Sequence, residues 1–154
     1  MMKAGRYYVG DLCYVLHDSW DDFCNLTIKD HACLEGEFNL PDGRRFATFN
    51  TKWGDGSYQD QQGRYYGVDA GLIGCILMSD IDNTDDDFVT GGQVIDFAED
   101  FYVWSEDGVI VFGNVKIDTD PAGAVVVFDM FLLPYFLYSS YVSGDASQIL
   151  LRKG

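Results

Sequence analysis

The chain has 154 residues, of which 47% are hydrophobic and 16% aromatic, and its formal net charge is -15. Its length suits one domain with a buried core, and its hydrophobic content excludes a chain that is disordered throughout. Only 10 Lys and Arg stand against 25 Asp and Glu, so direct binding to nucleic acid or to an anionic membrane is disfavoured and basic protein partners are favoured.

The first 30 residues predict two short strands and one helix. Residues 6–9 and 13–16 have the composition of strands and flank a Gly-Asp turn. Asp18 or Ser19 would cap the helix that follows, and Asp22 stands three residues after Ser19, as in a capping box. One face of this helix is apolar and should pack on the core: Trp20, Phe23, Cys24, Thr27 and Ile28.

From residue 34 onward the sequence predicts strands and tight turns. Two hairpins are expected, one around Pro41-Asp42-Gly43 and one around Gln61-Gln62-Gly63. A central strand (71–78) and a loop (80–92) follow, and then come four strands at 93–97, 101–105, 109–112 and 115–118. The predicted fold is mainly β, of the α+β kind. It is a single antiparallel β domain over residues 1–154, a twisted sheet or partly open barrel, with one N-terminal helix packed on it.

The C-terminal segment 122–154 begins with the apolar run AGAVVVFDMFLLPYFLYSSYV. This run is long enough to span a bilayer, which takes about 20 residues. However, Asp129 lies near its middle, Pro134 would break a helix, and its Val, Phe and Tyr content favours strands. We therefore expect no membrane span, but buried strands or a self-association surface that makes a homodimer.

No motif predicts catalysis or a cofactor. The four cysteines form no CxxC pair and the first residues lack the apolar stretch of a signal peptide, so reduced thiols in a cytoplasm are expected. No nucleophile-elbow or phosphate-loop sequence occurs, and the Cys and His spacings match no zinc pattern. We predict no catalytic residue, no metal centre and no cofactor. Asp80-Ile81-Asp82 begins like an EF-hand loop, but the glycine and the final Glu are missing.

The most unusual feature is an acidic stretch from Asp80 to Asp120, which contains twelve Asp and Glu and one base, Lys116. Apolar residues that suit strands are interleaved with these acids, so a folded scaffold would hold the charges in place. One interpretation is the solvated outer faces of strands. The other is a surface that imitates the phosphates of nucleic acid and binds a basic protein. The predicted contact residues are Asp82, Asp85, Asp86, Asp87, Glu99, Asp100, Glu106 and Asp107.

An alternative function is a small-ligand or divalent-cation site in a β domain. Aromatic and acidic residues are interleaved from residue 53 onward, although aromatic strand residues usually serve cross-strand packing. The candidate ligand-binding residues are Trp53, Asp55, Tyr58, Asp60 and Asp69.

Three sequence elements, GDLCYV from Gly10, WGDGSY from Trp53 and VDAGLIG from Val68, resemble a family of small acidic proteins of phages, prophages and plasmids. The likeness extends from Gly5 to about Pro121, and the apolar run after it departs from the family's acidic ending. The resemblance implies no catalytic residue. It implies a non-enzymatic inhibitor in the bacterial cytoplasm, where a host defence or nucleic-acid-handling protein would be its partner.

Overall fold

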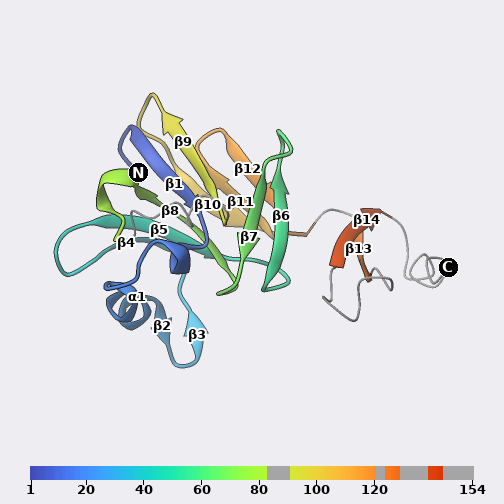
Figure 1. The fold of residues 1–154 in the computed structure, drawn as a ribbon, viewed down its shortest axis with the longest axis horizontal. Coiled ribbons are helices and arrows are strands. Elements are labelled where there is room, and N and C mark those ends of the chain that lie inside the picture. Colours follow the sequence, from blue (N-terminus) through green and yellow to red (C-terminus); the bar gives the residue numbers. More distant parts are fainter. Residues whose placement is uncertain (83–90, 121–123, 129–138, 144–154) are drawn as a thin grey trace. The chain divides into compact units, whose positions relative to one another are not determined.

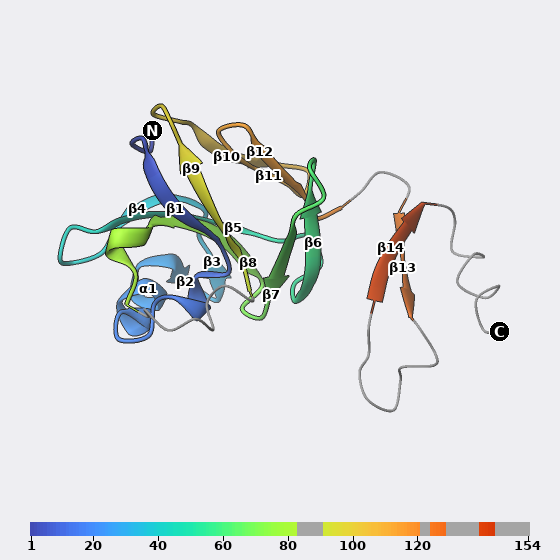
Figure 2. The same cartoon turned by 45° about the horizontal axis from the view of Figure 1, so that its top comes forward.

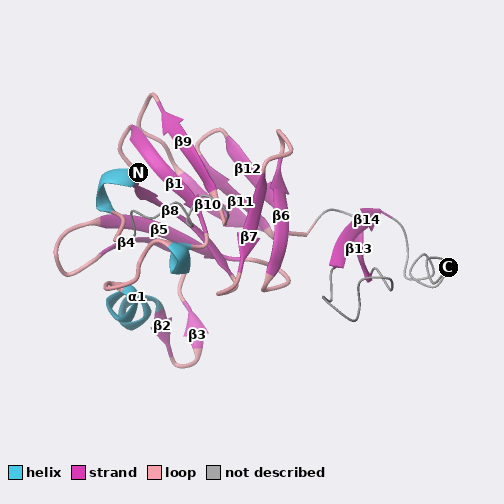
Figure 3. Ribbon diagram, viewed as in Figure 1, coloured by secondary structure: helices cyan, strands magenta, loops and turns pink. Residues whose placement is uncertain are grey.

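The computed structural model describes residues 1–82, 91–120, 124–128 and 139–143. The chain divides into two compact units, Met1–Thr119 and Asp120–Gly154. Strands dominate the described residues, which contain one α-helix (Figures 1 and 3). The expected mainly-β fold is therefore confirmed, and none of the sheets closes into a barrel. Whether residues 1–154 behave as one domain stays a prediction.

The first sheet of unit 1 has five antiparallel strands in the order β4-β5-β8-β1-β9. Residues distant in sequence pair within it, since Tyr8 of β1 lies opposite Ile76 of β8 on one side and Val94 of β9 on the other. The strands are β1 (Gly5–Gly10), β4 (Gly36–Asn39), β5 (Arg45–Asn50), β8 (Leu72–Leu77) and β9 (Gln93–Phe97).

The second sheet has the order β10-β11-β12-β6-β7, which makes β10 and β7 its edge strands. Both predicted hairpins are present, because β4 pairs with β5 and β6 pairs with β7 across their glycine-containing turns. The strands are β6 (Gly56–Asp60), β7 (Tyr65–Val68), β10 (Val103–Glu106), β11 (Val109–Phe112) and β12 (Val115–Asp118).

The helix α1 (Trp20–Thr27) covers one face of the first sheet (Figure 2). Phe23 is 1% exposed and its ring lies 5.0 Å from that of Phe46, so the helix packs on the core as predicted. Ile28 was expected on the same face, but this is wrong: Ile28 is 47% exposed. The helix has ended by then, and Ile28 belongs to a short hairpin of β2 (Ile28–Lys29) and β3 (Ala32–Cys33).

The strand predicted at residues 13–16 is also wrong, because the chain forms a short 3-10 helix, η1 (Leu12–Tyr14), instead. The Asp11 carboxylate caps this helix by accepting a hydrogen bond of 3.0 Å from the Cys13 N–H. Its other oxygen accepts from the N–H groups of Asp69 and Ala70, at 2.8 and 2.6 Å. A buried aspartate thus bends the chain where apolar composition alone favours a strand.

The other face of the first sheet packs on the second sheet. Tyr7 of β1 meets the ring of Phe101 edge to face at 5.1 Å, and Phe101 stacks on Phe97 at 3.9 Å. Phe49 of β5 contacts Phe112 of β11, with ring centroids 5.9 Å apart. Unit 1 therefore has three layers, which are the helix and the two sheets.

In unit 2, β13 (Ala124–Phe128) pairs with β14 (Ser139–Ser143) in an antiparallel hairpin. Residues 129–138 and 144–154 of the predicted C-terminal segment lie outside the described residues. Among the helices in the described ranges, none has the length and apolar character needed to cross a bilayer.

Candidate functional site

Strand β10 and the residue before it carry an exposed row of side chains that we call the β10 stripe, made of Tyr102, Trp104 and Glu106. Because side chains alternate along a strand, these residues share the face of β10 that points away from the first sheet. Their neighbours Val103 and Ser105 lie on the same face as the buried Phe112 and Ile110, with which they are paired. Tyr102 is 72% exposed and Trp104 is 45% exposed, so two large aromatic rings lie in solvent on an edge strand.

Acidic residues stand at both ends of the β10 stripe. Glu99 and Asp100 precede β10, and Glu106 and Asp107 occupy its end and the turn to β11; all four are exposed. Asp107 and Gly108 have φ values of 50° and 82°, the left-handed conformation of a tight hairpin turn. The turn thus fixes where the two final acids lie, and the residues at the two ends of β10 include four of the eight predicted contact residues.

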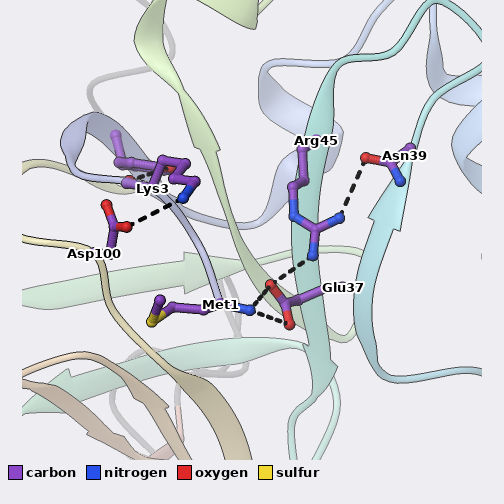
Figure 4. Close-up of polar contacts among 7 residues, drawn as sticks. Met1, Lys3, Glu37, Asn39, Arg45 and Asp100 are labelled. Carbon is purple, nitrogen blue, oxygen red and sulfur yellow. Dashed lines mark hydrogen bonds and ion pairs between the residues drawn. The ribbon is translucent and has the colours of Figure 1, made fainter.

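Asp100 is held by the segment before β1 (Figure 4). Its carboxylate accepts a hydrogen bond of 2.8 Å from the Ala4 N–H and pairs with Lys3 at 3.3 Å. These partners lower the pKa of Asp100, with the Ala4 N–H contributing most. Lys3 is 77% exposed at its side chain, so this ion pair is solvated and weak.

A further acid lies on the same face of the second sheet. Glu106 is opposite Val109, and Val109 is opposite Asp118 of β12, so Glu106 and Asp118 share one row two strands apart. The next row contains Trp104, Val111 and Lys116. Lys116 is therefore the base on this face that lies nearest in register to the β10 stripe, and it is separated from Trp104 by one strand.

Several basic side chains of unit 1 are engaged with other carboxylates. Arg45 pairs with Glu37 at 2.9 Å, next to the Met1 ammonium (Figure 4), and Arg64 pairs with Asp60 at 2.6 Å. Arg44 pairs with both Asp42 and Asp82. Since the exposed acids outnumber the bases that remain, the surface of unit 1 is strongly negative.

Asp82 is not part of the β10 edge. Its carboxylate accepts from Arg44 at 2.6 Å and from the Ser19 N–H at 2.8 Å, and its side chain is only 12% exposed. Burial raises its pKa, but these hydrogen bonds outweigh burial and lower the pKa overall. Ser19 occupies the N-cap position without capping the helix by its side chain, because its hydroxyl accepts from Arg44 instead. Asp82 thus anchors α1. Asp85, Asp86 and Asp87 lie outside the described residues.

The alternative ligand set is divided between the interior and the surface. Tyr58 is 2% exposed and its hydroxyl donates to the Gly54 carbonyl, and Asp60 is 7% exposed. The Asp60 carboxylate accepts from Arg64, from the Tyr66 hydroxyl at 2.8 Å and from two N–H groups of its own turn. Trp53, Asp55 and Asp69 are exposed in loops.

The three sequence elements that carry the family resemblance meet at one end of unit 1. Asp11 of the first element binds the N–H of Asp69 in the third, whose carboxylate also accepts from the Tyr14 hydroxyl. Thr51 precedes the second element and connects it to the third, through bonds to the carbonyls of Gly54 and Gly71. Within residues 1–82 and 91–120, no three His, Cys, Asp or Glu side chains are grouped so as to hold a metal ion.

The sequence predictions missed the two exposed aromatic residues of β10. Their signal was available, because Tyr102 and Trp104 alternate with Val103 and Ser105 in a run flanked by acids. Alternation shows that the two rings share a face but not that this face is the exposed one. That follows only from the edge position of β10 and the packing of Val103 toward the first sheet.

Comparison of the chain with protein-family models, curated proteins and solved structures found no match. The geometry of the β10 edge is therefore the ground for a functional proposal.

Proposed function

We propose that this protein is a non-enzymatic interaction protein, which presents an acidic surface to the basic groove of a nucleic-acid-handling protein. The observation that carries the proposal is the grouping of Glu99, Asp100, Glu106 and Asp107 along the β10 edge. Ordered backbone holds these acids, and a partner that binds phosphates with Lys and Arg would bind them by the same electrostatics.

The charge density argues for moderate, salt-sensitive affinity. Duplex DNA carries one charge per ~1.7 Å of its axis, and a nine-residue stretch such as Glu99–Asp107 with four acids is more sparsely charged. Asp118 adds negative charge on β12, two strands away in the same sheet. Such a surface competes with nucleic acid only for a partner that recognises shape as well as charge.

The family resemblance supplies the setting of the proposal. A phage or plasmid protein of this kind would act in the cytoplasm of a bacterial host and inhibit a defence protein that binds nucleic acid. The function rests on surface charge, so it requires neither a cofactor nor a catalytic residue.

The test is capture of proteins from a bacterial lysate by the immobilised full chain, followed by elution with duplex DNA. The test variant reverses three β10 acids, as Glu99→Lys, Glu106→Lys and Asp107→Lys. A matched control reverses three exposed acids elsewhere, as Asp18→Lys, Asp22→Lys and Asp55→Lys. We expect the test variant to lose capture of DNA-displaceable proteins by about tenfold or more, while the control with the same net charge retains it. Equal loss in both variants, or captured proteins that DNA does not displace, would refute the proposal.

A small-ligand or cation site is the second candidate, supported by the bond that joins the loops of Asp11 and Asp69 and by the bond that joins Thr51 to Gly71. A ligand that binds the native state raises the melting temperature in proportion to its affinity. A thermal-shift screen with nucleotides and divalent cations tests this candidate, using Asp69→Asn as the control. A flat response across the screen would rule against it.

We also propose that the apolar C-terminal segment mediates self-association. The β13–β14 hairpin pairs Val125 with Val142 and Val126 with Tyr141. The sequence of this segment is strongly apolar, and a hairpin of two strands is not independently stable in water. A second copy of the segment would bury these apolar residues.

A further inference from the structure

We propose that β10 recognises its partner by strand addition: an extended, arginine-rich segment pairs with the open edge of β10 and lays its guanidinium groups over Tyr102 and Trp104. This rests on the proposed function, since it names the chemistry of the partner for the same surface. It goes further in requiring backbone pairing and aromatic contact in addition to charge.

The first support is the direction of the backbone groups along β10. The Gly113 N–H donates to the Tyr102 carbonyl at 2.9 Å, so residues 102, 104 and 106 direct their backbone groups toward β11. Val103 and Ser105 must then direct theirs to the other side. Within the described part of the chain, no hydrogen bond involves the backbone N–H or C=O of these two residues. They are the available groups of an edge strand.

The second support is that this edge already accepts one antiparallel partner. Phe101, two residues before Val103, exchanges both backbone hydrogen bonds with Met2, at 2.8 and 2.9 Å. The same edge therefore has the geometry for antiparallel pairing at its first position. Val103 and Ser105 are the next two positions along this edge.

The third support is the composition of the face beside this edge. On an added strand, every second side chain would lie next to Tyr102, Trp104 and Glu106. Aromatic faces attract guanidinium groups, and Trp and Tyr are among the residues that dominate binding energies. Glu106 supplies a carboxylate at the end of the same row. Arginine therefore matches both kinds of group that the β10 stripe presents.

Charge selects a basic segment over a second copy of this chain. Two β10 strands paired antiparallel would bring Glu106 and Asp107 of one copy next to Glu99 and Asp100 of the other, and like charges across a sheet are destabilising. Glu35, which accepts from the Ser105 hydroxyl at 3.2 Å, adds another acid beside the edge. A segment rich in arginine meets opposite charge at each of these positions.

The test uses the full chain and a synthetic peptide of about eight residues in which Arg and Thr alternate. Ser105→Pro removes the outward N–H and leaves the hydrogen bonds to β11 intact, because proline is tolerated at such positions of edge strands. Ser105→Ala is the matched control, since it also loses the bond to Glu35 but keeps the N–H. Circular dichroism melting establishes that both variants fold.

We expect Ser105→Ala to bind the peptide like the original chain, and Ser105→Pro to weaken binding by about tenfold. Trp104→Ala should weaken it by about three- to fivefold, and N-methylation of alternate peptide residues should abolish it.

Equal binding by the Pro and Ala variants, no binding of the peptide by the original chain, or a dimer that Ser105→Pro dissociates would overturn the inference. If Ser105→Pro still captures DNA-displaceable proteins from lysate, strand addition is wrong and the acidic-surface proposal survives; if the charge-reversed variant also captures them, both fail.

Discussion

Asp60 is an acidic residue whose carboxylate stabilises the fold through hydrogen bonds instead of contributing to the acidic surface. Burial raises the pKa of Asp60, but the hydrogen bonds from Tyr66 and Arg64 and from two backbone N–H groups outweigh burial and lower the pKa below its usual 3.8. A carboxylate with a lowered pKa stabilises the native state above the pKa of the unfolded chain, and this stabilisation is lost as the pH falls through the native value.

We therefore predict that Asp60→Asn lowers the free energy of unfolding at pH 7 by about 1–3 kcal/mol, because Arg64 and Tyr66 lose an ionised acceptor. The difference between the original chain and the variant should shrink as the pH falls below 3.8, the unfolded-state value. Urea unfolding at a series of pH values measures this difference. A difference that stays constant down to about pH 2 would show that the ionised state of Asp60 is not involved.

The pair of Arg44 and Asp82 is the second prediction at this scale. Asp82→Asn should lower the free energy of unfolding by about 1.5–3 kcal/mol, because the pair is largely buried and also holds the first turn of α1. Asp42 binds the same guanidinium, but its side chain is 55% exposed. Asp42→Asn should therefore cost about 0–1 kcal/mol. Urea unfolding measures the loss of stability in both variants. Equal losses of free energy of unfolding in Asp82→Asn and Asp42→Asn would contradict the anchoring role of Asp82.

At the scale of elements, local turn chemistry predicted most of the strands. Pro41-Asp42-Gly43 places the β4–β5 hairpin, and β9, β11 and β12 begin and end where the alternation of apolar residues indicates. The error at residues 13–16 has a long-range cause, since Asp11 is bound by the N–H groups of Asp69 and Ala70. No local pattern contains that contact.

The sequence was also partly informative about the candidate site. It indicated the acids around β10 but also included Asp82, because charge in a sequence does not reveal which acids find a base. Arg44 is 38 residues away from Asp82, and only the folded chain brings them together. Likewise, Tyr58 and Asp60 resemble ligand residues in sequence, whereas the pleat of β6 places both on the buried face.

Close packing at Gly74 in β8 yields the prediction for this scale. A Cβ atom there would collide with the Ala47 carbonyl and lie 2.7 Å from the Leu12 Cδ1. Gly74→Ala should therefore lower the melting temperature, at a cost of about 1–3 kcal/mol. Gly67→Ala in β7 is the control, because its Cβ would meet nothing nearer than 3.6 Å. Thermal melts of the two variants compare them, and equal melting temperatures would contradict the packing at β8.

At the scale of the whole molecule, the two units predict a separable effect of the C-terminal segment. The core of unit 1 is formed within residues 1–119. We predict that a chain ending at Asp120 unfolds cooperatively, with a melting temperature close to that of unit 1 in the full chain, and that it is monomeric. The full chain should self-associate through the apolar residues of its C-terminal segment.

Light scattering after size exclusion, over a range of protein concentrations, measures this difference. A full chain that remains monomeric at all concentrations would contradict self-association through the C-terminal segment. Loss of cooperative unfolding in the shortened chain would contradict the independence of unit 1.

The place of β1 between β8 and β9 has a consequence for how the protein is made. Gly5–Gly10 is synthesised before both of its neighbours in the sheet, Leu72–Leu77 and Gln93–Phe97. Strand β1 thus lacks one of its two neighbours until residue 97 has been synthesised, and contacts so distant in sequence form slowly. During that interval the nascent chain exposes an unpaired, apolar strand, so synthesis in a cell should depend on chaperones more than the size of the finished protein suggests.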